Sequence, residues 1–90
     1  MEKYLLVIED AGDNLCAYFP DVPGCTTVGD TTEEVRRNAA EALALHLEDE
    51  DAPPHARTLS EIAADPEFEL DGTEVLAWLS YDRSEVLAFA

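Results

Sequence analysis

Residues 19–50 read FPDVPGCTTVGDTTEEVRRNAAEALALHLEDE, and this stretch decides the fold. Pro20 has no backbone N–H to donate to a neighbouring strand, so a strand that reaches it ends there. The tight loop that follows closes at Gly24, where the missing Cβ permits a conformation that other residues avoid. Residues 25–28 then predict a short strand. The stretch therefore predicts a strand end, a loop, a second strand and a helix in succession.

The helix is predicted by its cap and by its apolar spacing. Thr31 followed by Glu34 matches the capping box of a helix N-terminus. Apolar residues then recur at intervals of three and four, which indicates one buried face of a helix of about 18 residues. The acidic run at residues 48–51 and the two prolines after it end the helix. The predicted buried face consists of Val35, Ala39, Ala42, Leu43, His46 and Leu47.

Outward from this stretch, the chain alternates strand patterns with turns. Residues 4–9 are rich in β-branched and aromatic side chains and read as a strand that is apolar on both faces. Residues 15–19 and 74–81 predict further strands, and we expect Trp78 in the core. Residues 59–64 predict a short helical turn capped by Thr58 or Ser60. The apolar tail at residues 86–89 is either a fifth strand or an arm laid on a partner.

The two cysteines belong to neighbouring predicted strands. If the loop runs from Pro20 to Gly24, Cys25 pairs with Phe19 and Cys16 lies opposite Val28. The two thiols are then about three residues out of register, too far apart for a disulfide. We therefore expect two separate thiols.

These elements predict a single α+β domain over residues 1–90. The first three strands form an antiparallel meander, and the long helix returns across one face. A right-handed crossover then places the final strand beside the first and parallel to it. The prediction is a small mixed sheet of three to four strands with one long helix on one face. The other face is only partly covered, which indicates a homodimer, a higher homo-oligomer or another partner.

Charge is the strongest signal in the composition. The chain has 21 acidic residues against 5 basic ones, a net charge of −16, and residues 41–74 alone hold eleven acidic residues against one basic. Such a surface repels nucleic acid and attracts basic partners, so we expect no direct nucleic-acid binding. It is equally typical of the solvated surface of a halophilic protein, and both interpretations stay open.

Membrane insertion and secretion find no support in the sequence. No apolar run approaches the roughly 18 residues of a membrane span. The short apolar stretch near Met1 is interrupted by Glu9 and Asp10, which is not the pattern of a signal peptide. We therefore expect a cytoplasmic protein.

Three motifs of this chain occur in the same order as in a known family. The loop FPDVPGC (19–25), the cap GDT (29–31) and the helical segment NAAEAL (38–43), taken in this order, resemble the HicB-type antitoxin family. The resemblance covers residues 3–50 closely and the final strand at 74–81 loosely. It implies a partial ribonuclease-H-like fold without a working nuclease site. Many members carry a DNA-binding segment after the last strand. Because this chain stops within about ten residues of its last strand, we expect the short form of the family, which lacks that segment.

The resemblance also implies a partner, a small basic HicA-like toxin that cleaves mRNA with a histidine and is masked by the antitoxin. The acidic run Glu48, Asp49, Glu50 and Asp51 and the loop residue Asp21 are the candidate contacts. The alternative is a solitary homo-oligomeric domain of unknown role, without a toxin partner, with ligand binding as one possible role.

We expect no enzymatic activity, cofactor or metal site. A nuclease would need carboxylates that converge on two metal ions. Among so many acidic residues, coincidental candidates are expected, and they are Glu9, Asp10, Glu41, Glu48 and Asp82. His46 and His55 lack companions at ligand spacing.

Overall fold

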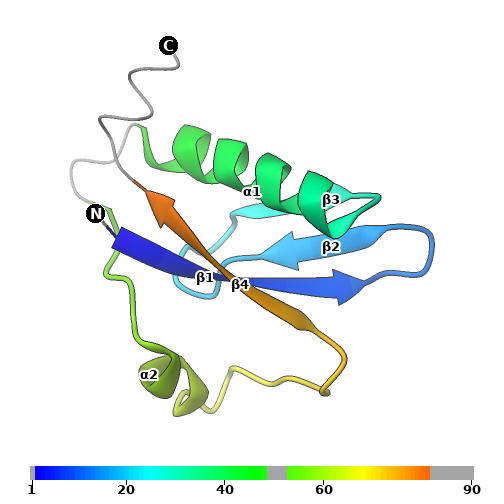
Figure 1. Cartoon of the computed structure of the whole chain (residues 1–90). Coiled ribbons are helices and arrows are strands. Elements are labelled where there is room, and N and C mark those ends of the chain that lie inside the picture. Colours follow the sequence, from blue (N-terminus) through cyan, green and yellow to red (C-terminus); the bar gives the residue numbers. More distant parts are fainter. Residues whose placement is uncertain (1, 49–52, 82–90) are drawn as a thin grey trace.

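Four strands and two helices make up the computed structural model, which describes residues 2–48 and 53–81 (Figure 1). The strands form one sheet in the order β3-β2-β1-β4, and each neighbouring pair is antiparallel. This confirms an α+β fold with one long helix on a small sheet. In chain order the elements are β1 (Glu2–Asp10), β2 (Leu15–Tyr18), β3 (Thr26–Gly29), α1 (Thr32–Leu47), α2 (Leu59–Ala63) and β4 (Val75–Tyr81).

Helix α1 begins where the cap was predicted. The Thr31 hydroxyl accepts a hydrogen bond from the backbone N–H of Glu34 at 3.1 Å, which satisfies one of the donors left free at a helix start. The helix has 16 residues and ends at Leu47. Ala42 is half-buried, but His46 is exposed, contrary to prediction, because it lies at the margin of the apolar stripe. The fully buried face consists of Val35, Ala39, Leu43 and Leu47.

The predicted parallel pairing of the last strand is wrong. Strand β4 runs antiparallel to β1, with Val75 opposite Ile8 and Tyr81 opposite Glu2. The chain leaves α1 near the start of β1, where the Tyr4 hydroxyl donates to the carbonyl of Pro54 at 2.6 Å. Residues 55–74 must then cross the sheet a second time before β4 begins (Figure 1). This second traverse reverses the direction of β4. The prediction was wrong because it counted only the traverse made by the helix. The partial ribonuclease-H-like description stays a prediction.

Alternate residues of β1 face two separate clusters. Tyr4, Leu6 and Ile8 belong to the large cluster beneath α1, which also takes residues from β2, β4 and the loop after β2. Leu5 and Val7 point to the opposite face, where Ile62 of α2 covers them. Strand β1 is therefore apolar on both faces, as predicted. Among the described residues, the second face is covered by α2 and the rest of the linker (residues 53–74), with Tyr18 and Phe68 packed beside it.

The loop after β2 has the predicted register. Cys16 lies opposite Val28, and the backbone N–H of Phe19 donates to the carbonyl of Cys25 at 3.4 Å. Gly24 has a φ of +84°, in the left-handed region that a Cβ disfavours. Within this loop Val22 is buried, which draws the neighbouring Asp21 inward.

Candidate partner-binding surface

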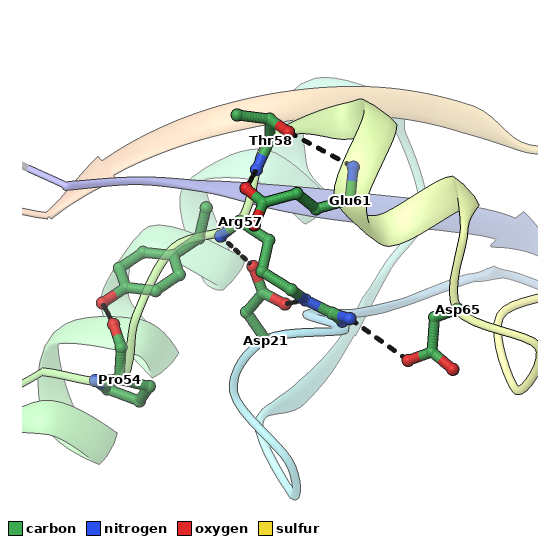
Figure 2. A network of polar contacts seen from close by, with 7 residues as sticks. Asp21, Pro54, Arg57, Thr58, Glu61 and Asp65 are labelled. Atoms are coloured by element: carbon green, nitrogen blue, oxygen red, sulfur yellow. Dashed lines mark hydrogen bonds and ion pairs between the residues drawn. The ribbon is translucent and has the colours of Figure 1, made fainter.

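Asp21 lies inside the molecule and not at an exposed loop tip. Its carboxylate accepts a hydrogen bond from the backbone N–H of Arg57 at 2.7 Å and another from the guanidinium Nε at 2.5 Å (Figure 2). The side chain of Asp21 is 3% exposed and that of Arg57 is 27% exposed. A buried carboxylate needs such partners, because an unpaired one would lose its hydration without compensation. The contacts seen for Asp21 are thus internal, and its contact with a partner protein stays a prediction.

Arg57 joins Asp21 to a second carboxylate. Its Nη1 donates to Oδ2 of Asp65 at 3.1 Å (Figure 2). The hydrogen bond to Asp21 and then the one to Asp65 raise the pKa of Arg57 above its ordinary value. The pKa of Asp65 is lowered, first by the hydrogen bond from the backbone N–H of Glu67 and then by Arg57. The loop after β2 is therefore tied to both ends of α2.

Helix α2 has a complete capping box. The Thr58 hydroxyl accepts from the backbone N–H of Glu61 at 3.2 Å, and the Glu61 carboxylate accepts from the backbone N–H of Thr58 at 2.9 Å (Figure 2). The backbone N–H of Thr58 and then its side-chain hydroxyl favour the charged form of the Glu61 carboxyl and so lower its pKa. These bonds stabilise α2 itself, whereas the bond between Tyr4 and Pro54 and the bonds between Arg57 and Asp21 join the linker to the rest of the fold.

The predicted acidic run lies at the margin of the described residues. Glu48 follows the last turn of α1 and is exposed, whereas Asp49, Glu50 and Asp51 lie outside the described residues. Acidic side chains are also spread over the rest of the described surface. Exposed acidic residues of the described chain include Glu9, Asp10, Asp13, Asp30, Glu33, Glu41, Glu61, Glu67, Glu69 and Asp71, and the exposed basic residues are Lys3, Arg36 and Arg37.

The carboxylates considered for catalysis fall on different elements. Glu9 and Asp10 are at the end of β1, Glu41 and Glu48 are on or just after α1, and Asp82 lies outside the described residues. Among residues 2–48 and 53–81, no group of three or more His, Cys, Asp or Glu side chains is placed to hold a metal ion. None of the described helices is long and apolar enough to cross a membrane.

A shallow hollow of about 180 Å³ opens beside Arg57. Burial, and then the charges of Glu9 and Glu74, raise the pKa of the Tyr18 hydroxyl at its wall. Sequence reasoning missed Arg57 as the centre of this region. The available signal was its isolation, since it is the one basic residue among eleven acidic ones in residues 41–74. The hollow is lined by Tyr18, Pro20, Arg57, Asp65, Glu67 and Phe68.

Comparison with known families gives a match along almost the whole chain. Residues 4–87 match the sequence model of a family described as the HicB-like antitoxin of bacterial toxin-antitoxin systems. A 14.9 kDa protein from the rep-hol intergenic region of Haemophilus phage HP1 is 36% identical over 69 residues, which make up 72% of this chain and 52% of that protein. The chain thus spans about half the length of this curated relative.

Solved structures share the fold. The N-terminal domain of the Burkholderia pseudomallei antitoxin HicB superposes with a TM-score of 0.72 at 28% identity, covering 89% of this chain and 98% of that one. A chain from a structure of the HicA3 and HicB3 toxin-antitoxin complex gives a TM-score of 0.66 at 28% identity, with the same coverage of 89% and 98%. The likeness therefore includes both the sheet and the helix that covers it.

Proposed function

Because this chain belongs to the HicB-like antitoxin family, we propose that it binds and masks a small basic mRNA-cleaving toxin of the HicA type. The observation that carries the proposal is the likeness to a chain of the HicA3 and HicB3 complex, which spans 89% of this protein. The net charge of −16 supports it, because an acidic surface attracts a basic protein and repels RNA. In this proposal the protein acts in the cytoplasm by covering the toxin, without binding nucleic acid or catalysing a reaction itself.

The acidic run is the proposed electrostatic contact. Glu48, Asp49, Glu50 and Asp51 follow one another in the chain, and Glu48 is exposed beside the end of α1. Four adjacent carboxylates concentrate negative potential, which steers a basic partner and speeds its association. A direct contact by Asp21 belongs to the same proposal, but it requires the carboxylate to leave Arg57. Asp21 otherwise contributes by holding the linker that begins after the run.

The partner itself is tested by recovery and by activity. The tagged chain is purified from its own host at low salt, and the proteins that accompany it are identified by mass spectrometry. We expect a small basic protein in stoichiometric amount, which high salt releases. The released protein should cleave mRNA, and the cleavage should stop when the chain is added back. If a released basic protein neither cleaves RNA nor responds to the chain, the proposed function is wrong.

The contact is tested by charge reversal with a matched control. Changing residues 48–51 to Lys should weaken toxin binding about tenfold or more and reduce its salt dependence. The control reverses four exposed acidic residues elsewhere and makes the same change in net charge. An equal loss of affinity in both variants would show that the acidity acts diffusely and would contradict the local contact. The control residues are Asp13, Glu41, Glu67 and Glu69.

The second candidate function is a solitary homo-oligomeric domain without a toxin partner. The exposed apolar residues of β4 favour it, because they suit contact between copies better than contact with a highly charged toxin. Recovery of the chain alone from its host, as a discrete oligomer, would support this candidate over the first.

A further inference from the structure

Strand β4 presents a long edge that none of the described residues covers. It lies at one end of the sheet order and pairs with β1 among the described strands. Its sequence VLAWLSY has seven residues without a charge, a proline or a glycine. Sheet edges usually carry such features, because open backbone groups otherwise pair with another strand.

The opposite edge of the same sheet is protected. Strand β3 has only four residues, and the side-chain amide of Asn38 on α1 donates to the carbonyl of Val28 at 2.9 Å. Helix α1 also packs closely there, since a Cβ on Gly29 would come within 2.8 Å of Val35. The chain thus covers one edge with a helix and leaves the other uncovered by the described residues.

The uncovered edge is also apolar on one face. Trp78 and Leu76 are 40% and 39% exposed, although their neighbours on β1, Leu5 and Val7, are buried. The expectation that Trp78 lies in the core is therefore wrong. In an antiparallel pair, opposite residues share a face, so Trp78 and Leu76 extend the small cluster of Leu5, Val7 and Ile62 to the edge of the sheet. This edge would bury more apolar surface if another strand were added to it.

We propose that β4 pairs antiparallel with β4 of a second copy about a two-fold axis at Trp78. The pairing joins two four-stranded sheets into one continuous sheet. A two-fold axis perpendicular to the sheet leaves the two faces of the sheet unchanged. Opposite residues of the two copies share a face, so their numbers must both be odd or both be even. Of these registers, the one centred on Trp78 pairs all seven residues of β4, with Val75 opposite Tyr81 of the second copy.

Charge favours a second copy over a basic partner at this edge. The strand has no charge that a basic protein could recognise. On the face that carries Trp78, the two ends of the strand differ in charge. Lys3 lies beside Ser80 at one end, whereas Glu9 and Glu74 come next after the pair of Ile8 and Val75 at the other. A two-fold axis brings the Lys3 end of each copy toward the Glu74 end of the other. The surface is therefore complementary to itself.

The proposal is independent of toxin binding and has its own salt dependence. Each copy has a net charge of −16, so long-range repulsion opposes the dimer and salt weakens that repulsion. The dimer should therefore tighten as salt is added, whereas binding of a basic toxin should weaken. Failure of one proposal is thereby distinguishable from failure of the other.

Sedimentation equilibrium of the full chain tests the dimer without any toxin. We expect a species of twice the 9.9 kDa chain mass that becomes more populated with salt. Leu76→Lys should weaken dimerisation about tenfold or more, because an edge lysine opposes strand pairing. The matched control is Leu45→Lys, which makes the same substitution on α1 at a side chain that is 61% exposed. A monomer at high salt, or equal dimerisation by Leu76→Lys and the unchanged chain, would overturn the proposal.

Cysteine crosslinking tests the register, and thermal unfolding confirms that each variant is folded. With Cys16 and Cys25 replaced by Ser and Ala, Trp78→Cys places two thiols opposite each other, with Cα atoms about 4.5–5.5 Å apart. In the same register, two copies of Ser80→Cys are about 13 Å apart along the strands. We expect oxidation to crosslink the first variant and not the second. Crosslinking of the Ser80→Cys variant, or of neither, would overturn this pairing.

Discussion

The two faces of β1 are stabilised in different ways, although one strand supplies both. On one face, thirteen buried residues of the described part of the chain form a continuous cluster beneath the 16-residue helix α1. On the other, Leu5 and Val7 meet a single buried residue of α2, Ile62. The first face is held mainly by packing, and the second depends on few apolar contacts supported by hydrogen bonds and by the two ion pairs of Arg57.

Helix length explains the contrast. Helix α2 has five residues, far fewer than the roughly 12–15 that an isolated helix needs to be even marginally stable. It therefore depends on its capping box, on Arg57 and on Ile62. Helix α1 needs its cap less, because it buries four side chains over several turns. Local opening should therefore begin on the α2 face, which includes the linker that follows the acidic run.

The largest expected effect comes from the packed face. Leu43→Ala removes a side chain that is 1% exposed at the centre of the α1 cluster, and we expect the free energy of unfolding to fall by about 2–5 kcal/mol. Chemical denaturation would measure the loss. The matched control is Leu45→Ala on the exposed side of the same helix, which should change stability by less than about 0.5 kcal/mol. Equal losses in both variants would contradict the assignment of this face to the core.

A smaller effect is expected on the α2 face. Ile62→Ala removes the one buried side chain of α2, and we expect a loss of about 2 kcal/mol, because the thin cover can collapse around the gap. Hydrogen exchange should speed up across residues 59–64 while α1 stays protected. Equally faster amide exchange in both helices would show that the two faces of the sheet unfold as one cooperative unit, which would contradict the difference between them.

Local features of the α1 face could be predicted from the sequence. The cap at Thr31 and the register of Cys16 with Val28 depend on residues close together in the chain, where turn and capping rules apply directly. The helix was predicted two residues too long and with His46 buried, because spacing alone does not define the margin of a buried face.

Features that depend on the linker could not be predicted in this way. The direction of β4 depends on a second traverse of the sheet, and no local pattern reports which end of the sheet a linker reaches. The ion pair between Asp21 and Arg57 joins positions 36 apart in the chain, so Asp21 read as a surface residue of a loop. Of the predicted contacts, only Asp21 and Glu48 fall within the described residues, and their binding role stays a prediction.

The ion pair offers a smaller perturbation of the same face. Asp21→Asn keeps the size of the side chain but removes its charge and leaves one acceptor oxygen for the two Arg57 donors. We expect a loss of about 1–2 kcal/mol, because one donor then faces an NH2 group. A double-mutant cycle with Arg57→Gln measures the coupling by chemical denaturation. The control Asp13→Asn, at an exposed position, should be close to neutral. Additive losses in the cycle would show that the pair does not hold the linker.

Lowering the pH should produce the smallest loss of stability, and the loss should be confined to α2 and the residues beside it. The hydrogen bond from the Thr58 backbone and then its side-chain hydroxyl lower the pKa of Glu61, and the bonds to Asp65 lower its pKa as well. A lowered folded-state pKa means that the carboxylate form is preferred in the fold. The stabilisation is therefore present above the ordinary values of 4.5 and 3.8, and it is lost as the pH falls through the lower folded-state values.

Both of these carboxylates lie on or next to α2, which packs on the face of the sheet opposite α1. As the pH falls from about 6 to about 3, amide exchange corrected for its intrinsic rate should therefore rise at residues 58–67 before it rises in α1. Thr58→Ala sharpens the comparison, because it removes one of the bonds to Glu61 and should move the pKa of that carboxyl back toward 4.5. NMR titration of the Glu61 carboxyl would measure this shift. If α1 loses protection first on acidification, the packed face is the weaker one, and polar contacts stabilise this protein more than its buried helix does.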